Sequence, residues 1–394
     1  MKDKQIQKLI EAEKKRQKKA VNLIASENYV SKDVLTALGS ELTNKYAEGY
    51  SGARYYGGNE IVDKIENLCQ ARALKAFKLA KNKWQVNVQP LSGSPANVAV
   101  YLALVPPGEK IMGMSLSHGG HLTHGHKVSI TGKMWTQVPY GVNEKTEKLD
   151  YEAIRTIAKK EKPKLIVAGF TAYPRKIDWP KFRAIADEVG AILMVDMSHV
   201  AGLVASGAYP SPFLSADVVT TTTHKTLRGP RSALIFSKPE LAEKINKAVF
   251  PGMQGGPHLN QIAAVAVALA EASRPEFKTY AKQVVKNAAV LAGELKKLGW
   301  RLVSGGTDSH LILMDVWNGG KPMTKGGRPL SGKEASDKLE AAGIIVNKNT
   351  IPGETRSPVN PSGIRLGTAA ETTRGKKEKD MIKLAARIDK ILRK

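Results

Sequence analysis

The sequence predicts an α/β protein with a mostly parallel central sheet in a large domain and a smaller α+β domain at the C-terminus. Two observations lead to this fold class. Short apolar runs such as Leu165–Gly169 and Ile192–Val195 are bounded by polar residues, as expected of parallel strands buried on both faces. Segments with helical periodicity lie between these runs, and such alternation of β and α is typical of a three-layer α/β sheet.

The N-terminal part is expected to be mainly helical. Helices are expected over residues 3–20, 33–42 and 61–78, with a Gly- and Tyr-rich loop over 43–59. Strands of the sheet are expected over 84–88, 110–114, 165–169, 192–195, 218–221 and 233–236, and helices over 96–104, 150–160 and 180–189. A long helix over 276–298, strands near Leu311 and Ile344 and a basic terminal helix would complete the chain. We therefore expect an N-terminal helical arm (1–45), a large domain (46–274) and a small domain (275–394).

Composition narrows the class of protein. The 394 residues are 42% hydrophobic, which supplies a large core and excludes a disordered chain. The longest apolar run, Ile262–Ala270, is far shorter than the roughly 20 residues of a membrane-spanning helix. No apolar leader and no disulfide partner for the single Cys69 are present, so a cytoplasmic protein is expected.

The charge favours anionic partners. Lys and Arg number 61 against 36 Asp and Glu, a net charge of +25. Nucleic acid and phosphorylated or polycarboxylate small molecules both fit this balance. The lysines are dispersed and aromatic residues make up only 6%, which is poor for base stacking, so nucleic acid is expected to bind only non-specifically.

Two charged residues each follow a predicted strand. Asp196 closes the run AILMVD, and Lys225 follows ADVVTTTTH. Because α/β enzymes place ligands at the carboxyl ends of parallel strands, both residues point to a ligand site. A lysine there can form a Schiff base with a carbonyl cofactor, and a carboxylate can keep a pyridinium nitrogen protonated. The alternatives are an ordinary polar loop around Lys225 and a helix N-cap at Asp196.

Two further segments concern anion and ring binding. In LSGSPAN, Ser94 is expected to cap a helix with Pro95 at its first position, so that Ser92, Gly93 and Ser94 form an anion cup, or only a helix cap. In SHGGHLTHGH, four histidines come without a carboxylate, a cysteine or HExxH spacing, so no metal site is expected. An imidazole stacked on a planar cofactor fits this segment better.

Together the segments resemble serine hydroxymethyltransferase, a family of pyridoxal phosphate (PLP) enzymes with the aspartate-aminotransferase fold, transferase fold type I. The resemblance runs along nearly the whole chain through LIASENYVS, TNKYAEGYSGARYYGG, LSGSPAN, SHGGHLTHG, GFTAYPR, VDMSHVAGL, TTTTHKTLRGPR, FPGMQGGP and SGIRLGT. The strings around Lys225 and Glu48 are highly specific in combination.

The resemblance implies a role for each matching residue. PLP would be bound covalently to Lys225 as an internal aldimine, with Asp196 on the pyridine nitrogen, His121 stacked on the ring, and His199 and Thr171 near the phenolic oxygen. The other cofactor-binding residues would be Ser92, Gly93, Ser94, Thr222 and His224, with Tyr46, Gly255 and Gly256 reaching the phosphate of the neighbouring subunit. The amino-acid substrate would contact Ser26, Glu48, Tyr56, Arg231 and Arg365. The folate would contact Leu116, Gly120, His121, Leu122, Asn349, Ser357, Pro358 and Val359.

The implied activity belongs to one-carbon metabolism. Through an external aldimine, the hydroxymethyl group of serine would pass reversibly to tetrahydrofolate, giving glycine and 5,10-methylenetetrahydrofolate. Lys225, Glu48, Asp196, His121, His199 and Tyr56 would be catalytic, Glu48 as the acid/base residue beside the serine hydroxyl and Arg365 as the bidentate partner of the substrate carboxylate. Folate-independent aldol cleavage of 3-hydroxy amino acids is also implied.

Some points stay open at this stage. A folate-independent aldolase such as threonine aldolase shares the chemistry, although Glu48 and the YAEGY motif favour the transferase. A basic nucleic-acid-binding protein that only inherited the fold is the alternative from another class. The one-carbon carrier could be tetrahydrofolate or a modified pterin. Thr171, Arg228 and Met253 depart from the pattern. The resemblance implies a homodimer with shared sites. Both ends look short, so the tetramer is left open.

Overall fold

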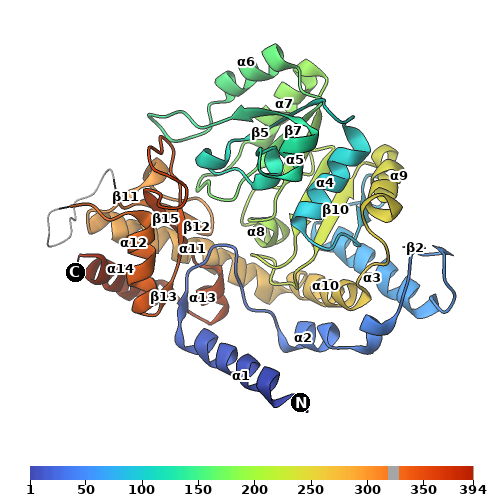
Figure 1. Ribbon diagram of the computed structural model, residues 1–394, viewed down its shortest axis with the longest axis horizontal. Coiled ribbons are helices and arrows are strands. Elements are labelled where there is room, and N and C mark those ends of the chain that lie inside the picture. Colours follow the sequence, from blue (N-terminus) through green and yellow to red (C-terminus); the bar gives the residue numbers. More distant parts are fainter. Residues whose placement is uncertain (318–327, 394) are drawn as a thin grey trace. The chain divides into compact units, whose positions relative to one another are not determined.

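The computed structural model describes residues 1–317 and 328–393. It divides into two compact units, one formed by 28–282 and the other by 1–27 together with 283–394 (Figure 1). The chain therefore passes from one unit to the other twice, after Glu27 and, within helix α11, after Lys282. The expected division into an arm, a large domain and a small domain stays a prediction. Within the described residues, no helix combines the length and apolarity needed to cross a membrane.

The unit formed by 28–282 is built on a seven-stranded sheet with the order β4-β10-β9-β8-β7-β5-β6. Its strands are β4 (Gln85–Asn87), β5 (Lys110–Met114), β6 (Thr136–Tyr140), β7 (Leu165–Gly169), β8 (Ile192–Asp196), β9 (Val218–Thr222) and β10 (Ala233–Ser237). Strands β5 to β9 run parallel, whereas β10 is antiparallel to both β9 and β4. The predicted α/β class with a mostly parallel sheet is confirmed.

The helices of this unit cover the sheet and extend beyond it. They are α2 (Lys32–Leu38), α3 (Glu60–Ala76), α4 (Gly93–Leu104), α5 (Ile130–Met134), α6 (Tyr151–Glu161), α7 (Trp179–Val189), α8 (Ala201–Ser206), α9 (Pro239–Lys247), α10 (Leu259–Ala272) and the first part of α11 (Pro275–Lys297). A short hairpin, β2 (Gly49–Tyr50) with β3 (Ala53–Arg54), lies in the predicted Gly- and Tyr-rich loop. One face of the sheet packs through Ile111, Val167 and Met194 against apolar side chains of α4 and α9.

Several local predictions need correction. Helix α4 begins at Gly93 with Ser92 as its N-cap, two residues before the predicted cap at Ser94, because the turn before Pro95 is already helical. The helix predicted over 33–42 ends at Leu38, and a separate 3₁₀ turn follows over Glu41–Asn44. The run Ala233–Phe236 forms a strand, but an antiparallel one, since it returns along β9 after a short loop.

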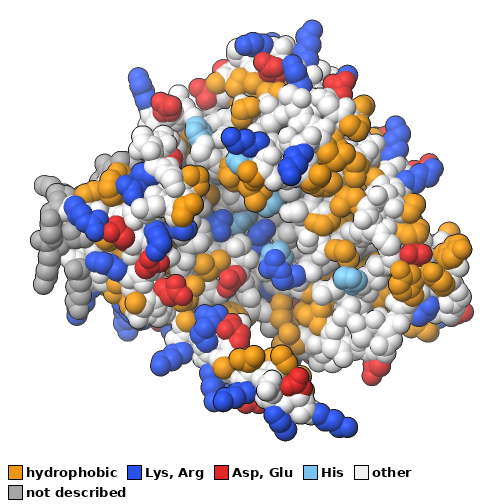
Figure 2. All heavy atoms as spheres, viewed as in Figure 1, with side chains coloured by type: hydrophobic (Ala, Val, Ile, Leu, Met, Phe, Trp, Pro, Cys, Tyr) orange, Lys and Arg blue, Asp and Glu red, His pale blue; other side chains and the backbone are white. Residues whose placement is uncertain are grey.

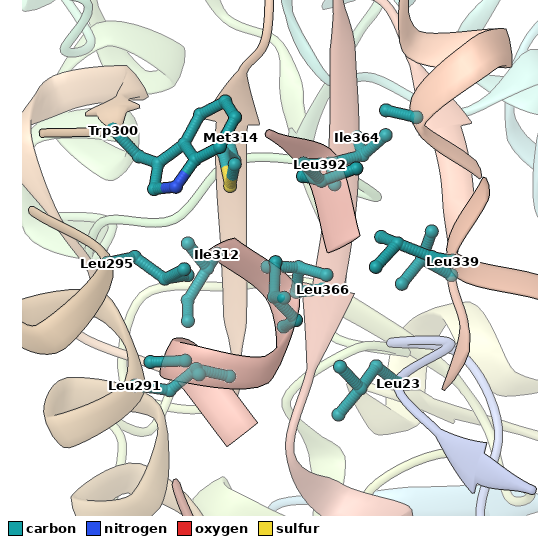
Figure 3. Close-up of a cluster of buried hydrophobic side chains, with 14 of the residues drawn as sticks. Leu23, Leu291, Leu295, Trp300, Ile312, Met314, Leu339, Ile364, Leu366 and Leu392 are labelled. Carbon is teal, nitrogen blue, oxygen red and sulfur yellow. The ribbon is translucent and has the colours of Figure 1, made fainter. Parts of the chain in front are cut away.

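The second unit contains a four-stranded antiparallel sheet with the order β11-β12-β15-β14. Its elements are α1 (Lys4–Lys19), β1 (Val21–Asn22), the rest of α11, β11 (Arg301–Leu302), β12 (Leu311–Asp315), α12 (Gly332–Ala341), β13 (Ile344–Ile345), β14 (Asn347–Asn349), β15 (Gly363–Gly367), α13 (Ala369–Thr373) and α14 (Glu378–Leu392). Strand β1 pairs in parallel with β13. The core joins Leu23, Leu291, Ile312 and Leu366 from four distant segments (Figure 3).

Candidate active site

The carboxylate of Asp196 lies at the carboxyl end of β8 and is held on both oxygens. Its Oδ2 accepts a hydrogen bond from Asn97 Nδ2 at 2.9 Å and lies 3.3 Å from His124 Nε2. Its Oδ1 accepts from the backbone N–H of Ser198 at 3.0 Å and from its hydroxyl at 2.6 Å. The backbone N–H of His121 donates to His124 Nδ1, so Nε2 carries the proton that faces Asp196.

These contacts decide the charge of Asp196. Burial alone would raise the pKa of the carboxyl group, but its interactions with His124, above all the hydrogen bond, and its hydrogen bond from Ser198 outweigh this effect. The pKa of Asp196 is therefore held well below its usual range. The carboxylate is ionised at neutral pH and can hold a proton on a ligand that approaches the sheet edge.

Lys225 lies at the same edge of the sheet. Strand β9, which ends three residues before it, is the parallel neighbour of β8, with Asp196 paired to Thr220. The amine of Lys225 is 3.3 Å from Thr222 Oγ1, and the Ser198 hydroxyl that donates to Asp196 also accepts the N–H of Thr222 at 3.0 Å. The structure thus brings the ends of the two strands together, as the sequence predicts.

The N-terminus of α4 faces this edge. Gly93 approaches β9 so closely that an added Cβ would lie 2.5 Å from Thr222 Cγ2, so only glycine fits here. The Ser92 side chain makes no capping hydrogen bond, and the first N–H groups of α4 lie in the turn formed by Ser92, Gly93 and Ser94. Free N–H groups and the helix dipole make such a turn a site for an anion.

Four other predicted cofactor residues belong to the same unit. His121 Nδ1 lies 2.7 Å from Thr123 Oγ1, and burial followed by the charge of His124 lowers the pKa of His121 to about 4. Thr171 donates to the carbonyl of Gly120 at 2.8 Å. His199 is buried, and its ring stacks at 6.3 Å on Phe170.

His224, the fourth, lies directly before Lys225. Burial, and next the charges of Lys225 and Arg231, lower the pKa of His224 to about 3. Its Nδ1 is buried and has no hydrogen-bond partner among the residues that the structure describes. The imidazole is therefore neutral and retains a polar atom for a ligand. Arg231, a predicted substrate contact, is exposed.

A second group of predicted residues forms an exposed cluster, which we call the tyrosine cluster: Tyr46, Glu48, Tyr56, Gly255 and Gly256. The hydroxyl of Tyr46 donates to Glu48 Oε1 at 3.3 Å, and the rings of Tyr46 and Tyr56 meet edge-on at 5.2 Å. A Cβ on Gly256 would touch the Tyr46 ring at 3.4 Å. Figure 1 shows the neighbouring strand β2 at the outer edge of the molecule, away from α8. Tyr46 and Tyr56 are 56% and 44% exposed, unusual values for residues assigned to a binding site.

The remaining predicted residues lie in the unit that contains β15. Arg365, on β15, is buried, its Nε donates to Asn347 Oδ1 at 3.0 Å, and burial lowers its pKa to about 10, so it stays charged at neutral pH. Ser26 follows Ala25, which packs so tightly on β15 that a Cβ on Gly367 would lie 2.4 Å from Ala25 Cα.

The predicted folate contacts are divided between the two units. Leu116, Gly120 and Leu122 lie in the loops after β5, and Leu122 is 43% exposed. Asn349 ends β14. In the turn that follows, the Ser357 hydroxyl accepts the N–H of Val359, which is 69% exposed.

The sequence did not reveal the residues that hold the carboxylate of Asp196 through hydrogen bonds. Asn97 donates to Asp196 and to Thr123 and accepts from Thr220, and it is almost fully buried. Ser198 and His124 complete the hydrogen bonds of Asp196. The sequence did contain a signal for Asn97: this polar residue lies one turn after Gly93, in a run of mostly apolar helical residues.

Comparison with known proteins gives the family. The profile of serine hydroxymethyltransferase matches residues 1–388. A serine hydroxymethyltransferase of Desulfotalea psychrophila is 55% identical over 390 residues, which is 99% of this chain and 88% of the relative. One of Legionella pneumophila is 57% identical over 380 residues, 96% of this chain and 88% of the relative. The chain, whose sheet edge brings Asp196, Lys225 and the N-terminal end of α4 together, belongs to the serine hydroxymethyltransferase family.

Proposed function

We propose that this enzyme transfers the hydroxymethyl group of serine reversibly to tetrahydrofolate, giving glycine and 5,10-methylenetetrahydrofolate. Membership of the family implies dependence on PLP. The observation that carries the proposal is the ionised carboxylate of Asp196 held by three side chains beside the strand that leads to Lys225. A pyridine nitrogen facing Asp196 stays protonated, which the chemistry of this cofactor needs.

The residues at this sheet edge fit PLP. The turn at Ser92, Gly93 and Ser94 offers helix N–H groups to the phosphate, and the space beside Gly93 is one that any larger residue would fill. His224 has a buried ring nitrogen that finds no partner within residues 1–317 and 328–393. When bound, PLP supplies an electron sink for the pair of electrons that remains when the Cα–Cβ bond of serine breaks.

Each residue then has a defined task. Lys225 would hold the cofactor covalently through its amine, which is a nucleophile toward a carbonyl carbon. His121 would pack against the ring, Thr171 and His199 would lie near its phenolic oxygen, and Thr222 and His224 would complete the pocket. Because the pKa of His121 is lowered to about 4, this imidazole stays neutral at working pH and adds no charge beside the cofactor.

The substrate carboxylate is bound by Arg365, whose planar guanidinium suits a bidentate contact. Ser26, Tyr56 and Arg231 assist in holding the amino acid. Glu48 moves the proton of the serine hydroxyl. The folate lies against Leu116, Gly120, Leu122, Asn349 and the turn of Ser357, Pro358 and Val359.

We propose further that the site is shared between two copies of the chain in a homodimer. Glu48 and Tyr56 belong to the exposed tyrosine cluster, together with Tyr46, Gly255 and Gly256. The exposed Tyr56 and the half-buried Glu48 are explained if the cluster completes the site of a second copy. A cytoplasmic location also stays a prediction.

Nucleic acid is not a specific partner in this proposal. Figure 2 shows Lys and Arg side chains spread over the visible face and interspersed with Asp and Glu. A dispersed charge attracts polyanions without reading their sequence, with a dissociation constant of roughly 10⁻⁴–10⁻⁶ M near physiological salt.

The test compares the protein with its Lys225→Ala variant. The purified enzyme is expected to be yellow, to form glycine from serine when tetrahydrofolate is present, and to change its spectrum when glycine and tetrahydrofolate are added together. Lys225→Ala is expected to keep the fold and to lose steady turnover, because release of the product has no intramolecular nucleophile. A colourless protein, or a Lys225→Ala variant as active as the parent, would contradict the proposal.

A further inference from the structure

Lys225 lies in a tight turn whose backbone is fixed from within. The N–H of Arg228 donates to the carbonyl of Lys225 at 3.1 Å, and the N–H of Gly229 donates to the carbonyl of Thr223 at 2.7 Å. A lysine side chain has four flexible methylene groups, so the range of its amine depends on how firmly its own backbone is held.

The side chain of Asn28 holds this turn from outside. Its Nδ2 donates to the carbonyl of Lys225 at 2.9 Å and to the hydroxyl of Tyr280 at 2.8 Å. A side-chain amide has only two N–H hydrogens, and both are used here. Asn28 therefore ties Lys225 to helix α11.

Tyr280 completes the connection. Its hydroxyl, which accepts from Asn28, lies 3.4 Å from the carbonyl of Thr226 and donates to it. The Tyr280 ring is almost buried and is covered by the guanidinium of Arg228, 4.5 Å from the ring centroid. The backbone of Arg228 has a φ of +60°, a conformation that a non-glycine residue rarely adopts. In this conformation the Arg228 side chain lies over the Tyr280 ring.

A second set of contacts, with His199 and with Gly202 of α8, also holds the turn. The hydroxyl of Thr226 donates to the carbonyl of His199 at 2.9 Å and accepts from the N–H of Gly202 at 3.1 Å. A Cβ on Gly202 would lie 2.2 Å from the carbonyl oxygen of Thr226, so α8 and the turn are in direct contact. The turn that carries Lys225 is thus held by α8 as well as by Asn28 and Tyr280.

We propose that Asn28 and Tyr280 are positioning residues that hold the Lys225 turn so that its amine reaches the aldehyde of PLP. This inference rests on the proposed function. In the step concerned, the neutral amine attacks the aldehyde carbon, a C=N bond replaces C=O, and the two amine hydrogens leave with the carbonyl oxygen as one water. Asn28 and Tyr280 act on the turn through its backbone carbonyls, those of Lys225 and Thr226.

The experiment measures this condensation directly. PLP is removed from the holoenzyme, added back at increasing concentration, and the covalent adduct is followed by absorbance, then fixed by borohydride and located by mass spectrometry. Asn28→Ala and Tyr280→Phe are expected to lower the limiting rate about tenfold, because a small misplacement of a reacting group is costly. The PLP concentration that gives half the limiting rate is expected to stay within about twofold, since the anion-binding turn is untouched.

Tyr140→Phe is the matched control. The hydroxyl of Tyr140 is also buried and donates to a backbone carbonyl, that of Val167 at 2.9 Å, but in the sheet away from the Lys225 turn. This variant is expected to react at the parent rate. If Asn28→Ala and Tyr280→Phe react as fast as Tyr140→Phe, the inference is wrong.

Further measurements distinguish a failure of this inference from a failure of the proposed function. If the two residues act as a unit, the double variant is no slower than the slower single variant, whereas a product of the two effects contradicts joint action. Should Asn28→Ala fail to fold, Tyr280→Phe decides alone, because it removes one oxygen and leaves the ring beneath Arg228. If the parent protein itself forms no reducible adduct on Lys225, the proposed function fails.

Discussion

At the scale of the residue, the buried guanidinium of Arg365 allows a prediction about substrate binding. Arg365→Ala removes a charged contact whose partner, the serine carboxylate, would be left unpaired, a loss of about 2–5 kcal/mol. The KM for serine should therefore rise at least roughly thirtyfold, with PLP affinity unchanged. Arg301→Ala, on β11 of the same sheet, is the control and should leave the KM for serine unaltered. A selective loss of PLP affinity in Arg365→Ala would identify Arg365 as a phosphate ligand.

Also at this scale, His121 predicts a pH dependence of stability. Its pKa is about 4 in the folded protein, below the roughly 6.5 of an unfolded chain. As the pH falls through this interval, the unfolded chain binds the proton first, so the free energy of unfolding falls; above about 6.5 this contribution is fully present. Urea unfolding at pH about 7 and about 4.5 measures the loss, and His121→Asn should lose less than the parent. Equal losses in the two proteins would refute the assignment.

The residues that sequence reasoning missed have a physical reason in common. Lys225 and Asp196 could be predicted because each follows an apolar strand, which fixes its place in the sheet. Asn97 and Ser198 act through hydrogen bonds that join distant segments, and such pairs leave no periodic pattern in the sequence. The exposure of Tyr56 was likewise invisible in the sequence, because a resemblance assigns roles and not accessibility.

At the scale of the element, the contacts of the hairpin β2–β3 allow a prediction about the free energy of unfolding. Arg54 is buried, pairs with buried Glu66 at 2.6 Å, and donates to the carbonyls of Ala47 and Gly49, which flank Glu48. Glu66→Ala leaves this buried cation without its closest partner, so urea unfolding should show a loss of about 3–5 kcal/mol.

An exposed ion pair provides the control for that measurement. Glu243 and Lys247 on α9 are one turn apart, with side chains that are 80% and 72% exposed. Glu243→Ala should leave the free energy of unfolding nearly unchanged, because an ion pair in water contributes little to stability. A Glu66→Ala loss as small as this would mean that water or another group replaces the missing carboxylate.

Elements differed in how well they could be predicted. The continuous apolar strands β5 and β7 have the predicted bounds because burial on both faces leaves an unambiguous run. Strand β6 was missed, since it pairs only with β5, contains Pro139 and has alternating burial, as edge strands do. The direction of β10 could not be read, because an apolar run carries no information on orientation.

At the scale of the whole molecule, the shared site predicts complementation between two inactive variants. Lys225→Ala and Glu48→Gln chains should each be inactive alone. In a mixed dimer, one site would receive Lys225 from one chain and Glu48 from the other, both unaltered, and so regain activity. After the chains are unfolded together and refolded, turnover should appear in the mixture and not in either separate sample. If the mixture stays inactive, each site takes both residues from a single chain.

The pairing of β1 with β13 also sets the order in which the two units can form during synthesis. Val21 pairs with Ile344, and Leu23 packs with Leu366, so the N-terminal segment has no partner until nearly the whole chain has been made. At about 5–20 residues per second, this wait lasts tens of seconds, while residues 28–282 can already fold. Helix α1, which buries no side chain and has basic residues in its last turn, keeps the waiting segment hydrated. Val21 and Leu23 are thus among the last residues to find their partners during synthesis.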